Sequence, residues 1–303
     1  MRMKRNSRRK QSYFSGKNIE ALGDIWDWLN IPKQNIPAYV RYIAENAFCL
    51  SDYKKSFSQP IDRISQVYPR WPVDMRFLLT TTVKPDKKAL IFNSFSILMR
   101  GYPNILRIND TYQFKSGVEG YVSASLDDGP DVDFLAPLFY REKNDYQINI
   151  SVTVYLSALA LNARPASEKI FKFSEGTAYE IMLKEFLKEN PSKTKKDFPY
   201  IKISTKQMTA LLPTEATSLY QYRAKILNIF PMDPFEKTEI FKLLLLSAGD
   251  SPKNSLKINL YVKKNDLNGY IPKKGDFIEG ILWMYGSTHF MTGALPTDDD
   301  IVE

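Results

Sequence analysis

Histidine and cysteine are almost missing from this 303-residue chain, which contains one of each, His289 and Cys49. A Ser-His-Asp or Cys-His catalytic centre would have to use His289, and a zinc site could draw at most one imidazole and one thiolate from the chain. A disulfide needs two cysteines, so none can form within one chain. Cys49 lies between two apolar residues and is expected in a core, while His289 is expected to be partly buried or at the surface. We therefore expect a protein that is not an enzyme and that binds no cofactor.

Long hydrophobic runs and the common nucleotide-binding and zinc motifs are also missing. The longest uncharged stretch, Tyr146 to Ala163, is interrupted by polar residues such as Gln147 and Asn149, so it predicts a strand and not a membrane span. No apolar signal-peptide segment follows the basic N-terminus. Together with the single cysteine, this favours a cytoplasmic location. Gly-x-x-x-x-Gly-Lys, Gly-x-Gly-x-x-Gly and His-Glu-x-x-His do not occur.

Positive charge is concentrated at the N-terminus. The chain has 42 Lys and Arg against 34 Asp and Glu, a net charge of +8, but seven of the basic residues lie in residues 1–17, where no acid occurs. The rest of the chain therefore carries a net charge of only +1. Such a basic tail neutralises phosphates of nucleic acid or acidic lipid headgroups, or serves only to keep the chain soluble. Its candidate phosphate contacts are Arg5, Arg8, Arg9 and Lys10.

Apolar residues at helical spacing follow the basic tail. They recur in 19–29 and in 39–48, and Pro60 opens a third such stretch that ends at Pro69. Three short helices would suit a DNA-reading unit, but their exposed faces carry acids such as Glu20 and Asp24, which would lie near phosphates. We therefore expect a helical cap packed on the next domain.

From residue 73 the apolar pattern changes to the two-residue period of strands. Strands are predicted at 75–83, 90–99, 105–108, 118–126, 134–140 and 148–161, and in the last third at 219–230, 239–247, 256–262 and 277–285. A helix interrupts them, because Thr177 and Glu180 form a possible capping box before an apolar stripe that ends at Asn190. Many short strands separated by Gly and Pro turns indicate barrels or sandwiches.

The predicted fold class is mainly β (α+β), with two β-barrel or sandwich modules, a small N-terminal helical cap and a helical connector. The element order of the last third, with a Lys274-Gly275-Asp276 turn before its fourth strand, is that of an OB-like barrel whose fifth strand is 289–294 or lies upstream. The predicted divisions are a basic tail at 1–17, a helical cap at 18–70, a β module at 71–163, a helical, lysine-rich connector at 164–196, and an OB-like module with an acidic C-terminal tail at 197–303.

A short internal similarity supports two related modules. Residues 112–122 and 270–282 share Tyr-x-x-Lys-x-Gly followed, after a gap in one copy, by Glu-Gly and strand-forming residues. The first glycine suits a turn with positive φ, and the second suits a bulge or a tight barrel corner. Glu119 and Glu279, equivalent in this similarity, are expected to be structural, as an ion pair or a bulge cap. Chance similarity is the alternative.

The lysines and aromatic residues of the last third carry the leading functional hypothesis. Between Lys253 and Lys274 there are six lysines against one acid, Asp266. OB barrels bind single strands by stacking bases on exposed rings while basic side chains follow the phosphates. We therefore predict a non-catalytic protein that binds single-stranded nucleic acid or its backbone. Besides the tail, the candidate contacts are Tyr222, Arg223, Tyr261, Lys263, Lys264, Lys273, Lys274 and Trp283.

Two other functions stay open. A structural or adaptor subunit would bind another protein through its β modules, and the segment 241–246 is apolar on both strand faces, which indicates a covered sheet or an interface. A metal-dependent enzyme would collect its cation at the acidic turn from Asp127 to Asp133. A solvated hairpin turn explains the same acids more simply.

Overall fold

The computed structural model describes residues 28–29, 31–46, 48–49, 63–68, 74–84, 89–115, 117–127, 129–232, 238–247 and 255–289. The basic residues predicted to contact phosphate, Arg5, Arg8, Arg9 and Lys10, lie outside the described residues, as do nearly all of the first predicted helix and the acidic C-terminal segment. The protein is mainly β. Among the described residues, no helix combines the length and the apolar character that crossing a membrane requires.

The N-terminal part contains one helix and a four-stranded antiparallel sheet. The short helix η1 (Lys33–Asn35) leads into α2 (Ile36–Asn46), where helical spacing predicted a helix. The sheet follows sequence order, with β1 (Phe48–Cys49), β2 (Arg63–Tyr68), β3 (Met75–Lys84) and β4 (Ala89–Met99). The helix predicted to begin at Pro60 is wrong, because β2 pairs with β3 from Arg63 opposite Val83 to Val67 opposite Leu79. Backbone pairing outweighs a weak helical pattern in a stretch that contains β-branched residues.

A nine-stranded sheet forms the body of the protein. Its first half contains β5 (Tyr102–Gln113), β6 (Gly120–Ser125), β7 (Asp131–Ala136), the short helix α3 (Phe139–Glu142) and β8 (Ser151–Pro165). Its second half contains β11 (Ala210–Pro213), β12 (Leu219–Pro231), β13 (Ile240–Ser247), β14 (Leu256–Lys263), the short helix η4 (Lys264–Leu267) and β15 (Phe277–Ser287). The strand order is β11-β12-β13-β14-β8-β15-β7-β6-β5, with β12–β15 and β8–β5 pairings in addition.

These extra pairings close the strands into two circuits. The C-terminal circuit runs β12-β13-β14-β8-β15 and back to β12, and the N-terminal circuit runs β5-β6-β7-β15-β8 and back to β5. Both circuits use β8 and β15, which pair with each other from Tyr155 to Pro165. The β14–β8 and β7–β15 pairings are parallel and the others are antiparallel. The two circuits are therefore joined through two shared strands.

The two halves of the body repeat the same element order of three strands, a short helix and a fourth strand. The first half runs β5, β6, β7, α3, β8, and the second runs β12, β13, β14, η4, β15. The similarity between 112–122 and 270–282 aligns β6 with β15 instead, so it relates strands that hold different places in this order. The turn glycine of each copy has a positive φ, 75° at Gly117 and 93° at Gly275, as the sequence predicted. A side chain at Gly280 would overlap the carbonyl oxygen of Asn162 on β8, which explains the glycine inside this strand.

Two large apolar clusters hold the body together. The first gathers inward-facing side chains of both circuits, among them Phe134, Leu156 and Ile258. The second lies between the N-terminal sheet and the body, where Phe77 and Ile97 pack with Tyr261 and other aromatic residues. On β13, Leu243 and Leu245 are buried in the first cluster, whereas Leu244 and Leu246 are partly exposed.

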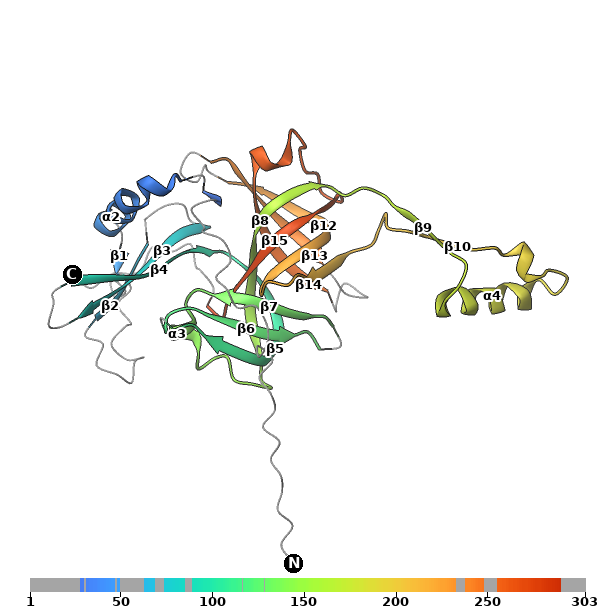
Figure 1. Ribbon diagram of the computed structural model, residues 1–303, viewed down its shortest axis with the longest axis horizontal. Helices are drawn as coiled ribbons and strands as arrows, with labels where there is room; N and C mark the ends of the chain where they lie inside the picture. The colour runs from blue at the N-terminus through green and yellow to red at the C-terminus, as the bar shows by residue number, and fades with distance from the viewer. Residues whose placement is uncertain are drawn as a thin grey trace, which may run out of the picture.

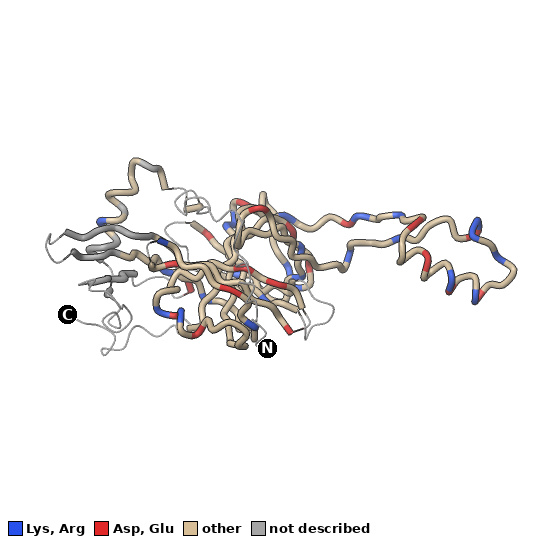
Figure 2. The backbone as a smooth tube through the Cα atoms, turned by 60° about the horizontal axis from the view of Figure 1, so that its bottom comes forward, with Lys and Arg blue, Asp and Glu red and all other residues tan. Residues whose placement is uncertain are grey.

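A long arm, residues 168–208, projects from the body between β8 and β11 (Figure 1). It consists of the antiparallel strands β9 (Ile170–Phe173) and β10 (Ile201–Ser204), with α4 (Thr177–Glu189) and η3 (Lys195–Asp197) at its tip. The helix predicted here is confirmed, but Thr177 does not cap it, because Gly176 precedes the first turn at a φ of 94°. Figure 2 shows from a second direction that the arm extends away from the body.

Candidate functional site

The three rings predicted to stack on bases are buried. Tyr222, Tyr261 and Trp283 are 3%, 0% and 9% exposed. Tyr222 lies in the first apolar cluster, whereas the Trp283 indole donates a hydrogen bond of 3.0 Å to Ser218 Oγ. The expectation that these rings are exposed is therefore wrong. A buried ring cannot stack on a base, so the two circuits need another surface if they bind nucleic acid.

The outer face of β14 is occupied by the protein's own N-terminal sheet. The Tyr261 hydroxyl lies 3.2 Å from the carbonyl oxygen of Asp74 and 2.9 Å from that of Arg100, at the two ends of the β3–β4 hairpin. The Asp74 carboxylate binds Lys242 of β13 at 2.5 Å and Arg100 at 3.3 Å. These contacts fix the hairpin on β13 and β14.

The predicted lysines contact different partners. Lys263 donates to the carbonyl of Trp28 at 3.1 Å and lies 3.5 Å from Asp266. Lys264 forms an ion pair of 2.8 Å with Glu239. Lys273 and Lys274 are exposed in the turn before β15. Two of the four are thus already paired with acids, and no aromatic ring predicted for stacking lies exposed beside them.

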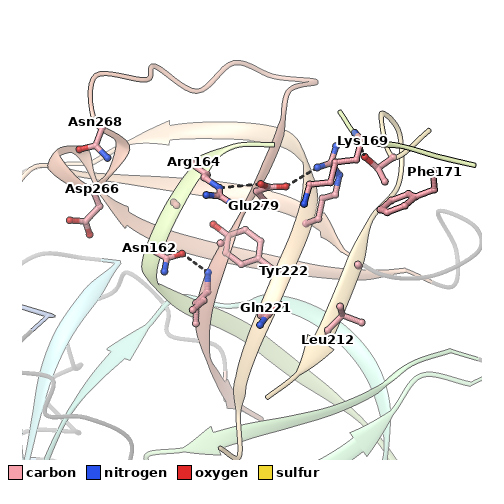
Figure 3. A pocket seen from close by; sticks show the side chains of 16 residues that line it. Asn162, Arg164, Lys169, Phe171, Leu212, Gln221, Tyr222, Asp266, Asn268 and Glu279 are labelled. Atoms are coloured by element: carbon pink, nitrogen blue, oxygen red, sulfur yellow. Dashed lines mark hydrogen bonds and ion pairs between the residues drawn. The ribbon is translucent and has the colours of Figure 1, made fainter. Parts of the chain in front are cut away.

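A groove with a volume of about 690 Å³ lies where the arm leaves the body (Figure 3). Arg223 is here, and it binds Glu279 at 2.8 Å, while Arg164 binds the other oxygen of Glu279 at 3.1 Å. The structural ion pair predicted for Glu279 is thus present. Lys169 and the ring of Phe171, from the arm, also line the groove. Sequence reasoning missed Arg164, Lys169 and Phe171, because only the return of the arm to β12 and β15 brings these residues together.

His289 belongs to a hydrogen-bonded cluster around the buried Glu142. The carboxylate of Glu142 accepts hydrogen bonds from Tyr146, at 2.5 Å, and from Ser287. His289 Nδ1 lies 3.5 Å from Glu142 Oε1, and this hydrogen bond raises the pKa of His289 above its ordinary 6.5 against the opposing effect of burial. The Ser287 hydroxyl donates to the carboxylate and not to the imidazole, which differs from a serine nucleophile activated by histidine. The cluster instead links α3 to the end of β15.

Of the acidic stretch, Asp127 lies in the turn after β6, whereas Asp131 and Asp133 lie in β7 and pair with Ser125 and Ser123. Asp131 is exposed and accepts from Asn109 at 3.5 Å, whereas Asp133 is only 5% exposed. Within the part of the chain that the structure describes, no three His, Cys, Asp or Glu side chains gather as a possible metal site. Glu119 and Glu279 lie in different surroundings, since burial raises the pKa of Glu119 to about 7 while Glu279 is ion-paired.

The arm carries an apolar face on its two strands. Ile201 lies opposite Phe173, and Ile203 lies opposite Phe171, so these four side chains share one face of the ribbon. Phe171, Phe173 and Ile203 are 47%, 42% and 37% exposed. The opposite face carries Lys172 and Lys202, which contact the ring of Tyr200. We call the face that carries Phe171, Phe173, Ile201 and Ile203 the arm face.

The tip of the arm has a small core of its own. The rings of Tyr179 and Phe186 stack on Phe198 with centroids 5.9 and 4.8 Å apart, and the Tyr179 hydroxyl donates to the Phe198 carbonyl. Two further apolar side chains of α4, Ile181 and Met182, are about half exposed. The tip is thus internally packed, whereas on the arm face Ile201 is buried and Phe171, Phe173 and Ile203 are partly exposed.

The described residues define a mainly β protein in which two strand circuits share two strands and support a projecting arm. The sequence matches no protein family and no curated protein, and no solved structure matches the chain.

Proposed function

We propose that the protein is a non-catalytic structural or adaptor subunit that binds a protein partner through the arm. The observation that carries this proposal is the arm face, where Phe171, Phe173 and Ile203 stand exposed on a two-stranded ribbon. A function in binding another protein was one of the alternatives that the sequence left open. The arm, and not the strand β13, is the surface that fits it best.

The energetics of a two-stranded ribbon support this proposal. Two isolated strands are marginally stable in water, because the outer backbone edge of each strand and at least one face of the ribbon stay solvated. Contiguous exposed apolar side chains on such an element are typical of protein interfaces. A partner that covers the arm face would remove three apolar side chains from water and stabilise the ribbon at the same time.

The proposal gives the body the role of a rigid support. We infer that each circuit is an OB-like barrel, because its strands follow the order 1-2-3-5-4-1, with strands 3 and 5 parallel and a short helix between strands 3 and 4. In this assignment β8 is strand 4 of one barrel and strand 5 of the other, and β15 has the reverse roles. Two barrels that share strands cannot move separately, so the arm has a fixed base.

An affinity capture with matched variants tests the arm as a protein-binding surface. The full chain, immobilised and incubated with an extract of its source cells after nuclease treatment, should retain a protein that the Phe171→Ser/Phe173→Ser variant loses. Ile170→Ser is the control, because Ile170 is 60% exposed on the same strand but faces the other way. If every retained protein binds the double variant equally well, the arm face is not a binding surface.

Nucleic-acid binding stays a second proposal, supported by the groove at the base of the arm. Arg164, Lys169 and Arg223 line it beside the half-exposed ring of Phe171, and exposed rings next to cations suit single strands. The basic residues of the tail, Arg5, Arg8, Arg9 and Lys10, would add salt-sensitive affinity.

Titration of a single-stranded oligonucleotide at two salt concentrations tests this second proposal. Arg164→Glu/Lys169→Glu should weaken binding, and deletion of residues 1–17 should flatten its salt dependence. Lys264→Glu is the matched charge control, because Lys264 already pairs with Glu239 and does not line the groove. No binding in the micromolar range would end the nucleic-acid proposal.

A further inference from the structure

We infer that a single strand of nucleic acid follows the outer face of β12, from the turn at 272–276 to the groove at the base of the arm. Its phosphates lie on exposed lysines, and a base lies in the groove. This inference rests on the nucleic-acid proposal above. It adds the path of the strand outside the groove and the side chains that hold the strand there.

One face of β12 points out of the C-terminal circuit. Tyr222, Ala224 and Ile226 are buried in the first apolar cluster, and the residues between them lie on the opposite face of the strand. Arg223 on this outer face lines the groove. Lys225, the next residue on the same face, is exposed about 7 Å further along the strand. Positive charge therefore continues from the groove along β12.

The turn before β15 extends this positive surface. The amide of Gly275 donates a hydrogen bond of 2.8 Å to the carbonyl oxygen of Ile226, the residue that follows Lys225 on β12. Lys273 and Lys274 lie in this turn and are exposed. The turn is therefore held beside β12 just beyond Lys225. We call the following set the basic stripe, with its groove end first: Lys169, Lys225, Lys273 and Lys274.

The lysines of the basic stripe are available to a ligand. None of their four ammonium groups forms an ion pair, a hydrogen bond or a ring contact within the part of the chain that the structure describes. Acids along the stripe already have partners: Glu279 binds Arg164 and Arg223, Asp276 accepts from Tyr270, Asp266 pairs with Lys263, and Glu168 accepts from Ser204. An external polyanion would therefore supply the counter-charges that these lysines lack.

The groove end of the stripe favours a single strand as this polyanion. The ring of Phe171 is 47% exposed and lines the groove together with Lys169, and the groove has a volume of about 690 Å³. A base can stack on such a ring while basic side chains follow the backbone. In a duplex the faces of the bases are stacked on one another, so only an unpaired base can lie on Phe171.

Titration of a fluorescent oligothymidylate into the full chain at several salt concentrations tests the path. Lys225→Gln/Lys273→Gln/Lys274→Gln should weaken binding about tenfold or more at low salt. It should also reduce the slope of log affinity against log salt by about 2, because each phosphate contact to a single strand contributes about 0.7. The matched control, Lys184→Gln/Lys188→Gln/Lys193→Gln, removes three exposed lysines near the tip of the arm (Figure 1) and should change both quantities little.

The remaining outcomes separate this inference from the nucleic-acid proposal. If the stripe variant binds like the unchanged chain while Arg164→Glu/Lys169→Glu binds weakly, the groove binds nucleic acid but the stripe does not, and the inference is overturned. Equal losses in the two triple variants would also overturn it, because net charge and not position would then decide affinity. A duplex or polyglutamate that competes as well as the single strand would overturn the choice of ligand. No binding by the unchanged chain in the micromolar range ends both.

Discussion

Glu279 on β15 accepts a hydrogen bond of 2.8 Å from Arg223, the residue directly opposite it on β12. On its other side Glu279 faces Arg164 of β8, again as a direct strand partner, and binds it at 3.1 Å. One carboxylate thus links three neighbouring strands of the C-terminal circuit. The side chains of Arg223 and Glu279 are 12% and 15% exposed, whereas that of Arg164 is 74% exposed.

We expect the two arginines to contribute unequally to stability. Glu279→Gln leaves the guanidinium of Arg223 largely buried without its counter-charge, and should lower the free energy of unfolding by about 1.5–3 kcal/mol. Arg164→Gln, the control, removes an exposed partner and should cost about 0.5 kcal/mol or less. Urea denaturation followed by fluorescence measures both. Equal losses from the two substitutions would contradict the unequal roles assigned here.

Tyr261 is expected to hold the N-terminal sheet on the body. Tyr261→Phe removes the hydroxyl that lies between the carbonyls of Asp74 and Arg100, and should cost about 1–2 kcal/mol because these groups are largely shielded from water. Hydrogen exchange of the amides of β3 and β4 should accelerate more than that of β12.

The control for this substitution is Tyr200→Phe, since Tyr200 is 36% exposed on the arm. Tyr200→Phe also removes one tyrosine hydroxyl, and it should leave both the free energy of unfolding and the hydrogen exchange of β3 and β4 unchanged. If both variants behave alike, the hydroxyl of Tyr261 does not fix the hairpin.

The strands of the last third could be predicted from the sequence, because their signal is local. On β12, Tyr220, Tyr222 and Ala224 alternate with Gln221 and Arg223, and this two-residue period marks a strand with one buried face. The predicted 219–230 corresponds to the observed Leu219–Pro231. The period does not reveal which face is inside, so the sequence alone cannot tell that the candidate rings of Tyr222 and Trp283 are buried.

The candidate site depends on contacts between distant parts of the chain, and these have no local signal. Tyr261 is buried because a hairpin that ends at Arg100 packs over β14, and the groove exists because the arm returns Thr205 and Ala210 beside Arg164. The arm itself was predicted as a connector with a helix. Its apolar residues alternate like those of a buried ribbon, and only the fold shows that nothing in the described chain covers the face of Phe171 and Phe173.

The ion pair between His289 and Glu142 makes stability depend on pH. The pKa of His289 is raised in the folded protein above its ordinary 6.5, so the stabilisation is fully present below pH 6.5 and is lost as the pH rises through the raised value. The free energy of unfolding should therefore decline across this range. Since His289 is about half exposed, we expect a small decline.

His289→Gln should remove the part of this decline that His289 contributes, and thermal denaturation at a series of pH values measures it. Asp145→Asn is the companion variant, because Asp145 lies 3.9 Å from the imidazole and contributes less than Glu142 to the raised pKa. A decline of unchanged size in His289→Gln would assign the pH dependence to another group.

The second group expected to titrate in this range is Glu119, which is partly buried in the turn that leads into β6, near the hydroxyls of Tyr121 and Tyr285. Burial raises its pKa from 4.5 to about 7. The contribution of this group to the free energy of unfolding is therefore fully present below pH 4.5 and is lost as the pH rises through about 7. Glu119→Gln keeps the shape without the charge, and should stabilise the protein above pH 7 by up to about 3 kcal/mol.

Because His289 titrates in an overlapping range, the comparison is made in the His289→Gln background. Asp127→Asn, an exposed acid in the next turn, is the control and should change little. If Glu119→Gln destabilises the protein at about pH 8, the carboxylate makes a favourable contact in the fold and burial does not dominate its titration.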